Sequence, residues 1–195
     1  MAPINTYTMK EEIQKAIKTL RDGGLILFPT DTYWSIGGDA TNEQVVSKML
    51  ALTQLDSAAN LEVLIDQAGK LQSYLEEVPE MAWDLIELSE KPLTIIYSQV
   101  KNLATNLLSD DKSVGIRVTR EVFSRNLCTQ FRNPIVHTVA NINGKALPNN
   151  FYEISENIKR SVDYVVNYRQ DEKTAPTPSS IIKLGNGNTI KIIKE

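Results

Sequence analysis

The sequence has few of the residues on which several kinds of protein chemistry depend. Cys128 is its only cysteine and His137 is its only histidine. One cysteine cannot form an internal disulfide, and this pair cannot supply a thiolate or multi-histidine zinc site. No apolar run approaches the roughly 20 residues that cross a bilayer. The amino-terminal stretch MAPINTYTMKEEIQ also lacks the basic and then apolar pattern of a secretory signal. We therefore expect a soluble protein of the reduced cytoplasm that holds no metal of its own.

The sequence also lacks a large excess of charge of either sign. The 195 residues include 24 acidic and 21 basic ones, which gives a net charge of −3. This balance argues against binding nucleic acid by bulk charge, although a local basic strip stays possible. With 42% hydrophobic and 23% charged residues the chain has a globular composition. Its length suits one domain spanning residues 1–195.

Helical and strand patterns alternate along the chain. Thr8 and Glu11 have the spacing of a capping box, and Gly23-Gly24 end the helix that follows. The apolar run Leu25–Phe28 is typical of a buried strand, and the loop PTDTYWSIGGDA comes next. We predict a second helix that Thr41 or Asn42 caps and whose apolar face carries Val45, Met49 and Leu52. Further helices are expected near 71–75, 81–88, 122–131 and 154–158, further strands at 61–65, 93–97, 114–118 and 163–168, and a strand and loop over 134–141. A carboxy-terminal hairpin is expected to turn at Asn186-Gly187. The pattern predicts an α/β fold with a twisted mixed β-sheet flanked by helices.

Polar side chains follow or interrupt the apolar strands in three places. The first is Thr30-Asp31-Thr32, next to Tyr33 and Trp34. The second is Arg117 inside an apolar strand, and the third combines His137-Thr138 and Asn141 with Ser179-Ser180. Ligands of open α/β sheets usually bind where strands end. Hydroxyls, an amide and an arginine suit phosphate and carboxylate binding better than acid–base hydrolysis.

Each of these features also has a purely structural interpretation. Thr30, Asp31 and Thr32 are residues that commonly bond their own backbone in turns. Arg117 could form an internal ion pair, because a buried guanidinium needs an anion. A single histidine such as His137 is more often a satisfied core or surface residue than a base, and the aromatic pair after Thr32 suits wall packing. The residues alone predict a ligand-binding α/β domain.

Five segments in order carry a further resemblance. PTDTYWSIGGDAT, KPLTIIY, GIRVT, PIVHTVANING and PSSII together resemble the Sua5/YciO/YrdC family from about Gly23 to Lys194. The resemblance implies a YrdC/RibB-like sheet with a positively charged concave ligand cleft. It also implies a nucleotidyltransferase, L-threonylcarbamoyladenylate synthase, which combines L-threonine, bicarbonate and ATP (with Mg²⁺) and releases pyrophosphate. The product serves the modification of adenosine-37 in tRNA, and relatives have been described as binding double-stranded RNA.

The resemblance also implies roles for individual residues. Thr32 and Arg117 match the positions that contact the amino acid and its carboxylate, and Ser179 matches a further substrate contact. The remaining matches are partial: Thr138 and Asn141 keep part of a substrate-binding Ser-Thr-Ser-Ala-Asn loop, while Thr30, Ser113 and Lys194 fall at nucleotide-binding positions.

Several charged residues of the family pattern are absent. The positions of a Lys-x-Arg motif read Thr53, Gln54 and Leu55, and a nearby Lys or Asn reads Ala59. Val139 replaces a serine, and Ser35 replaces a glycine. A hydrogen bond to a charged group is worth roughly 1.5–3 kcal/mol, so losing two corresponds to about 10²–10⁴-fold in phosphate affinity.

Three functions follow from these observations. The first is a synthase with weakened triphosphate binding. The second is a catalytically impaired paralogue that binds a nucleotide or double-stranded RNA. The third is a cleft that keeps carboxylate recognition but takes another small acid.

Overall fold

The computed structural model describes residues 6–185 and 189–195 of the chain. Its helices are α1 (Thr6–Arg21), α2 (Glu43–Thr53), α3 (Leu71–Tyr74), α4 (Glu80–Leu88), α5 (Val122–Phe131) and α6 (Glu156–Ser161). Its strands are β1 (Ile26–Phe28), β2 (Ser35–Asp39), β3 (Glu62–Ile65), β4 (Leu93–Tyr97), β5 (Val114–Val118), β6 (Ile135–Val139), β7 (Tyr164–Val165), β8 (Ser180–Gly185) and β9 (Thr189–Lys194).

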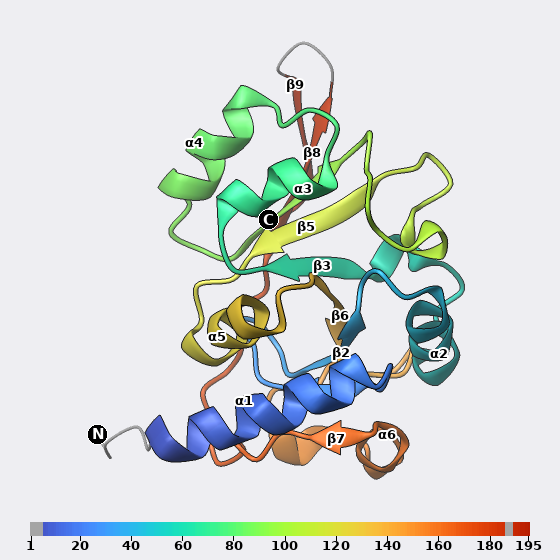
Figure 1. The fold of residues 1–195 in the computed structure, drawn as a ribbon, viewed down its shortest axis with the longest axis vertical. Coiled ribbons are helices and arrows are strands. Elements are labelled where there is room, and N and C mark those ends of the chain that lie inside the picture. Colours follow the sequence, from blue (N-terminus) through green and yellow to red (C-terminus); the bar gives the residue numbers. More distant parts are fainter. Residues whose placement is uncertain (1–5, 186–188) are drawn as a thin grey trace.

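The strands form one mixed sheet in the order β7-β1-β2-β6-β3-β5-β4-β8-β9. Three of its pairs are parallel, namely β1 with β7, β3 with β5, and β4 with β8. The β8–β9 hairpin lies at one end of the molecule, while β7, α1 and α6 lie at the other (Figure 1). The mixed α/β fold expected from the sequence is confirmed.

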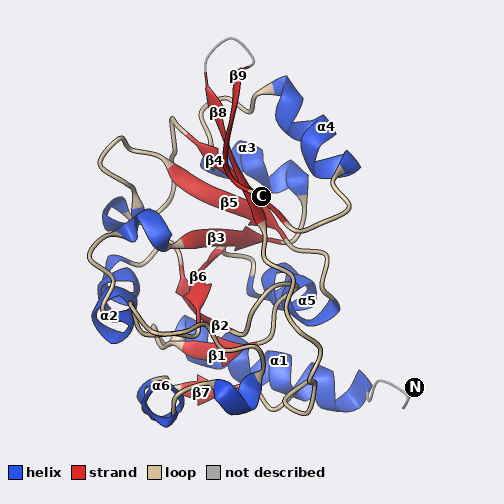
Figure 2. Cartoon of the chain, turned by 180° about the vertical axis from the view of Figure 1, so that it is seen from behind, coloured by secondary structure: helices blue, strands red, loops and turns tan. Residues whose placement is uncertain are grey.

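Strand side chains alternate between two hydrophobic cores. Val63 and Ile65 pack in the core that contains residues of α2 and α3, whereas Leu64 packs in a second core with α1 and α5. Because the side-chain period of a strand is two, Glu62 shares the face of Leu64. Its partners across the sheet are Gly115 on β5 and His137 on β6. In the view from behind, no helix lies over β3 and β5 (Figure 2).

Some predicted boundaries were wrong. Helix α1 begins at Thr6, so Thr8 lies within the helix and does not cap it. The predicted loop after Leu25–Phe28 contains strand β2, whose Gly37 and Gly38 lack the side chains that usually mark a strand. Strand β7 has only two residues of the predicted 163–168. In contrast, Gly23 has the expected left-handed conformation, with φ of +73°. The predicted turn at Asn186-Gly187 lies outside the described residues.

Candidate functional site

Two adjoining cavities open on the sheet face that carries Glu62. The smaller has a volume of about 100 Å³ and the larger about 630 Å³. Both are lined by Glu62 of β3 and Ile181 of β8, which form their common wall. Since a water molecule occupies roughly 30 Å³ of liquid, the smaller cavity suits a small polar molecule. The larger falls within the roughly 300–1,000 Å³ range of nucleotide-sized ligands.

The smaller cavity gathers residues that lie far apart in the sequence. Four of the predicted site residues line it: Thr32, Thr138, Ser179 and Lys194. Tyr33, Ser35, Asn60, Glu62, His137, Val139, Leu147, Pro178 and Ile181 complete the wall. The cavity therefore combines several hydroxyls with one cation and one carboxylate, which suits a small molecule that carries both charges.

The loop after β1 is rigidified by its own hydroxyls. Thr30 is buried, donates a hydrogen bond to the backbone oxygen of Tyr33 at 2.7 Å, and accepts one from the backbone N–H of Thr32 at 3.1 Å. This is the turn chemistry that threonine favours. Thr30 lines neither cavity, so it positions Thr32, which does line the smaller one.

Arg117 lies beneath the smaller cavity, although we expected its guanidinium to reach into it. The side chain is fully buried and forms an ion pair with Asp31. Its Nε lies 3.6 Å from Oε2 of Glu62, and one terminal nitrogen lies 3.4 Å from Oγ1 of Thr32. A buried guanidinium that lacked such partners would strongly destabilise the fold. Arg117 therefore organises the cavity floor through Thr32 and Glu62.

His137 is buried beside this ion pair. Its Nε2 lies 3.3 Å from a terminal nitrogen of Arg117 and 3.7 Å from Oε2 of Glu62. Burial, and then the positive charge of Arg117, hold the pKa of His137 well below its ordinary value of 6.5. The imidazole is therefore neutral at pH 7. Its Nδ1 has no hydrogen-bond partner among the described residues, so His137 is not the satisfied histidine that we favoured from the sequence.

The larger cavity carries charge of both signs. Ser113 lines it, and its hydroxyl donates to the carboxylate of Asp111. Lys183 also binds Asp111, and this ammonium, followed by the Ser113 hydroxyl, lowers the pKa of Asp111 to about 2. Of the lysines in the wall, Lys183 is thus already paired with a carboxylate, whereas Lys191 has no ion pair within the described residues.

One of the positions where the expected cations are missing, Ala59, lies at this cavity. Ala59 lines it directly, and no charge is supplied there. Thr53 is buried, and its hydroxyl donates to the backbone oxygen of Met49 at 2.7 Å. Leu55 packs against the core that contains α2. None of these three side chains supplies a cation.

Two further predicted site residues, Asn141 and Lys194, do not lie where their predicted roles require. The side-chain amide of Asn141 donates to the backbone oxygen of Lys145 at 2.9 Å, and Asn141 lines neither cavity. Lys194, expected at the nucleotide, lines the smaller cavity. The aromatic pair behaves partly as expected, since Trp34 is buried with its ring centroid 4.8 Å from that of Phe151.

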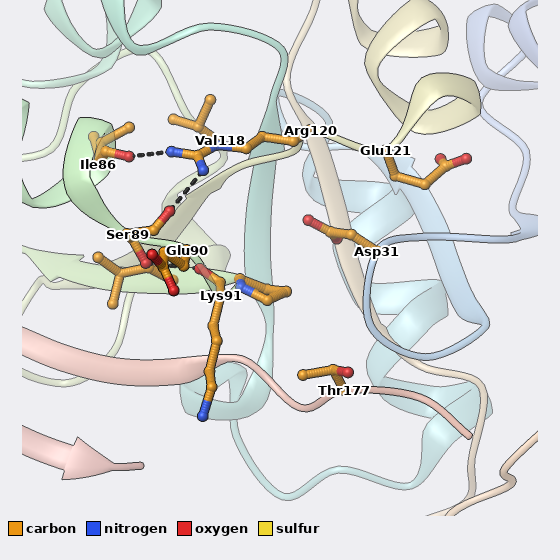
Figure 3. A pocket seen from close by; sticks show the side chains of 11 residues that line it. Asp31, Ile86, Ser89, Glu90, Lys91, Val118, Arg120, Glu121 and Thr177 are labelled. Atoms are coloured by element: carbon orange, nitrogen blue, oxygen red, sulfur yellow. Dashed lines mark hydrogen bonds between the residues drawn. The ribbon is translucent and has the colours of Figure 1, made fainter. Parts of the chain in front are cut away.

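A third cavity has a volume of about 600 Å³ (Figure 3). It is lined by Asp31 and Thr177, which belong to the segments that carry Thr32 and Ser179 of the smaller cavity. On its opposite wall, Arg120 donates to the backbone oxygens of Ile86 and Ser89 (Figure 3). Arg120 is therefore engaged in holding α4 to the start of α5.

Glu62 was missed by the sequence reasoning. It interrupts the apolar run LEVLI in the same way that Arg117 interrupts VGIRV. The same physical signal, a charge within a strand, was available and identifies the partner of Arg117 on the neighbouring strand.

Among the described residues, no helix combines the length and hydropathy that a bilayer-spanning segment requires.

Comparisons with known proteins agree on one family. The family model named Sua5_yciO_yrdC, described as "Telomere recombination", matches residues 18–195. The chain is 27% identical over 182 residues to a threonylcarbamoyl-AMP synthase of Pseudoalteromonas translucida, covering 92% of this chain and 96% of that protein. Its fold is similar to that of E. coli YciO, with a TM-score of 0.82 and 21% identity over 96% of this chain and 89% of the other. It also resembles P. abyssi Sua5 complexed with L-threonine, with a TM-score of 0.74 and 24% identity over 88% of this chain. The chain spans only 50% of that Sua5 chain.

Proposed function

Since the chain belongs to the Sua5/YciO/YrdC family, whose model matches residues 18–195, we propose that it is a threonylcarbamoyl-AMP synthase-like enzyme. The reaction joins L-threonine, bicarbonate and ATP into threonylcarbamoyl-AMP and releases pyrophosphate. We propose that residues 1–195 act as one domain and that the product serves the threonylcarbamoylation of adenosine-37 in tRNA.

One observation carries this proposal: a small polar cavity and a nucleotide-sized cavity share a wall. The reaction requires a carbamoylated amino acid to attack the α-phosphate of ATP. Such an attack needs the two reactants in contact, since positioning supplies much of the rate enhancement. Two separate cavities on different faces would not allow it.

We assign the amino acid to the smaller cavity and the nucleotide to the larger one. Thr32, Thr138 and Ser179 present hydroxyls to the amino acid, and Arg117 supports Thr32 from below. Ser113 lies in the wall of the larger cavity, where it would meet the nucleotide. Mg²⁺ would arrive with ATP, because magnesium is usually bound through substrate phosphates and few protein ligands.

The test is pyrophosphate release by the purified protein with ATP, L-threonine and bicarbonate. We expect release that requires all three substrates and that needs a high ATP concentration, because cradle cations are missing. Ser179→Ala should lower kcat/KM for threonine roughly tenfold, as expected for one lost hydrogen bond. Ser73→Ala, at an exposed position of α3 that lines none of these cavities, is the matched control and should have no effect. A folded wild-type protein that releases no pyrophosphate would refute the proposal.

The missing cations favour a second candidate, an impaired paralogue that binds a nucleotide or double-stranded RNA. Ala59 lines the larger cavity at a position where the family pattern has a Lys or Asn, and Glu62 adds a carboxylate to the same wall. RNA binding would depend on the lysines of β8 and β9 and would weaken steeply with salt, because phosphate contacts release counterions. Electrophoretic mobility shifts of tRNA and a double-stranded RNA at two salt concentrations test it. Salt-sensitive binding together with absent pyrophosphate release would favour this candidate over the first.

A further inference from the structure

Glu62 occupies the wall between the two cavities. Its side chain is 21% exposed, and it is a lining residue of both. Oε2 accepts a hydrogen bond from Thr94 at 3.1 Å and lies 3.6 Å from Nε of Arg117. In the part of the chain that the structure describes, the polar contacts of Glu62 all use Oε2, and Oε1 has no hydrogen-bond partner. The carboxylate is therefore held by one oxygen, and the other stays available to a ligand.

The charges around Glu62 do not cancel. Arg117 carries one positive charge, and two carboxylates, those of Asp31 and Glu62, lie against it. His137 is neutral, for the reasons given above, so the floor formed by Arg117, Asp31 and Glu62 carries one excess negative charge, while Lys194 carries a positive charge elsewhere in the wall. A cation placed against this floor is attracted, and partial burial strengthens the effect.

The hydrogen-bond pattern also fixes the tautomer of His137. A guanidinium can only donate hydrogen bonds, so Nε2, which lies 3.3 Å from Arg117, must accept. We therefore assign the imidazole hydrogen to Nδ1. The His137 side chain is about 4% exposed, it lines the smaller cavity, and Nδ1 has no partner among residues 6–185 and 189–195. A buried N–H without a partner is destabilising, and an acceptor oxygen of a ligand would relieve this.

From these contacts we propose that Glu62 and His137 determine the specificity of the smaller cavity. Glu62 accepts the ammonium group of a zwitterionic α-amino acid, while Nδ1–H of His137 donates to an oxygen of its carboxylate. The same carboxylate of Glu62 disfavours a polyphosphate on the wall that the two cavities share. This inference rests on the proposed function for the presence of an amino acid in the smaller cavity, and it adds the residues that recognise the two ends of that molecule.

The first experiment measures, by calorimetry, the affinity for L-threonine and for 3-hydroxybutyrate, which is threonine without its amino group. The wild-type protein should prefer threonine by about ten- to a hundredfold, the range expected for one charge-assisted hydrogen bond. Glu62→Gln keeps the shape and an acceptor for Thr94 but removes the charge. It should reduce the preference to less than about threefold and should tighten the binding of inorganic triphosphate roughly tenfold. Glu87→Gln, an exposed position away from the cavities, is the control with the same change in net charge.

The second experiment separates the two residues. His137→Phe removes the donor but keeps a ring, so it should weaken threonine and 3-hydroxybutyrate by the same factor, because both carry the carboxylate. His137→Asn, which can place an N–H near the position of Nδ1, should restore part of both affinities. A melting temperature close to that of the wild type confirms that each variant is folded.

The outcomes distinguish this inference from the proposed function. If Glu62→Gln binds threonine and still prefers it to 3-hydroxybutyrate by the wild-type factor, the inference is overturned and the synthase proposal stands. Threonine binding with the predicted changes but without pyrophosphate release would support the inference and refute the synthase proposal. A wild-type protein that binds no amino acid would overturn both.

Discussion

Replacing Asp31 by asparagine tests how strongly the buried ion pair of Arg117 stabilises the protein. The guanidinium is fully buried, and the side chain of Asp31 is only 15% exposed. Removing one partner of a buried pair costs about 3–5 kcal/mol, because the other charge is left uncompensated. Glu62 remains 3.6 Å from Nε, so we expect the lower end of this range, about 3 kcal/mol. For a chain of this length that corresponds to a loss of roughly 6–12 °C in melting temperature.

Differential scanning calorimetry and urea unfolding at pH 7 measure this effect. Asp22→Asn is the matched control, since its pair with Lys18 is highly exposed and contributes little. The double variant Asp31→Asn/Arg117→Met should recover part of the lost stability, because it removes the unpaired charge as well. A melting temperature of Asp31→Asn within about 2 °C of the wild type would refute the assignment of Arg117 as a buried, paired charge.

Three further predictions follow from particular contacts. The pKa of His137 is held well below 6.5 in the folded state, so the unfolded chain gains this proton before the folded protein does as the pH falls below about 6.5. Wild-type stability should then drop by up to about 1.4 kcal/mol per pH unit relative to His137→Asn, and parallel pH profiles in urea unfolding would contradict this. Ala59→Lys places a cation in the larger cavity and should tighten ATP binding roughly tenfold by calorimetry, with Ala59→Gln as the uncharged control. Gly38→Ala would bring its Cβ to 2.2 Å from Cγ1 of Val45 and should lower the unfolding free energy by about 1–3 kcal/mol; an unchanged urea midpoint would show that α2 adjusts freely.

Much of the fold could be predicted because the spacing of hydrophobic residues and the positions of turn residues indicate the same helices and strands along the chain. Mainly apolar runs indicated β1, β4 and β5, and Asn42, one of the two predicted caps, caps α2 with its side chain. Strand β2 was missed because Gly37 and Gly38 hide the strand pattern. Both glycines are required by packing, since a Cβ on Gly37 would lie 2.5 Å from Phe28. The family resemblance proposed from five ordered segments is confirmed by the match over residues 18–195.

The candidate site could be predicted only in part. Thr32, Thr138, Ser179 and Lys194 meet at one cavity, although long stretches of sequence separate them. The sequence left Arg117 between an internal ion pair and ligand binding, and it did not identify the partners, because Asp31 and Glu62 approach from two other segments. Pairwise contacts of this kind arise from strand register, which sequence spacing does not contain. The roles assigned to these residues stay predictions that the binding experiments address.

The central claim is that the protein synthesises threonylcarbamoyl-AMP from substrates bound in the two adjoining cavities. The most direct measurement is mass spectrometry of the products formed from ATP, L-threonine and carbon-13-labelled bicarbonate. We predict a labelled threonylcarbamoyl-AMP that requires all three substrates and increases with ATP concentration over a wide range. Protein that is folded and binds threonine, yet forms no labelled adenylate at any ATP concentration, would contradict the account.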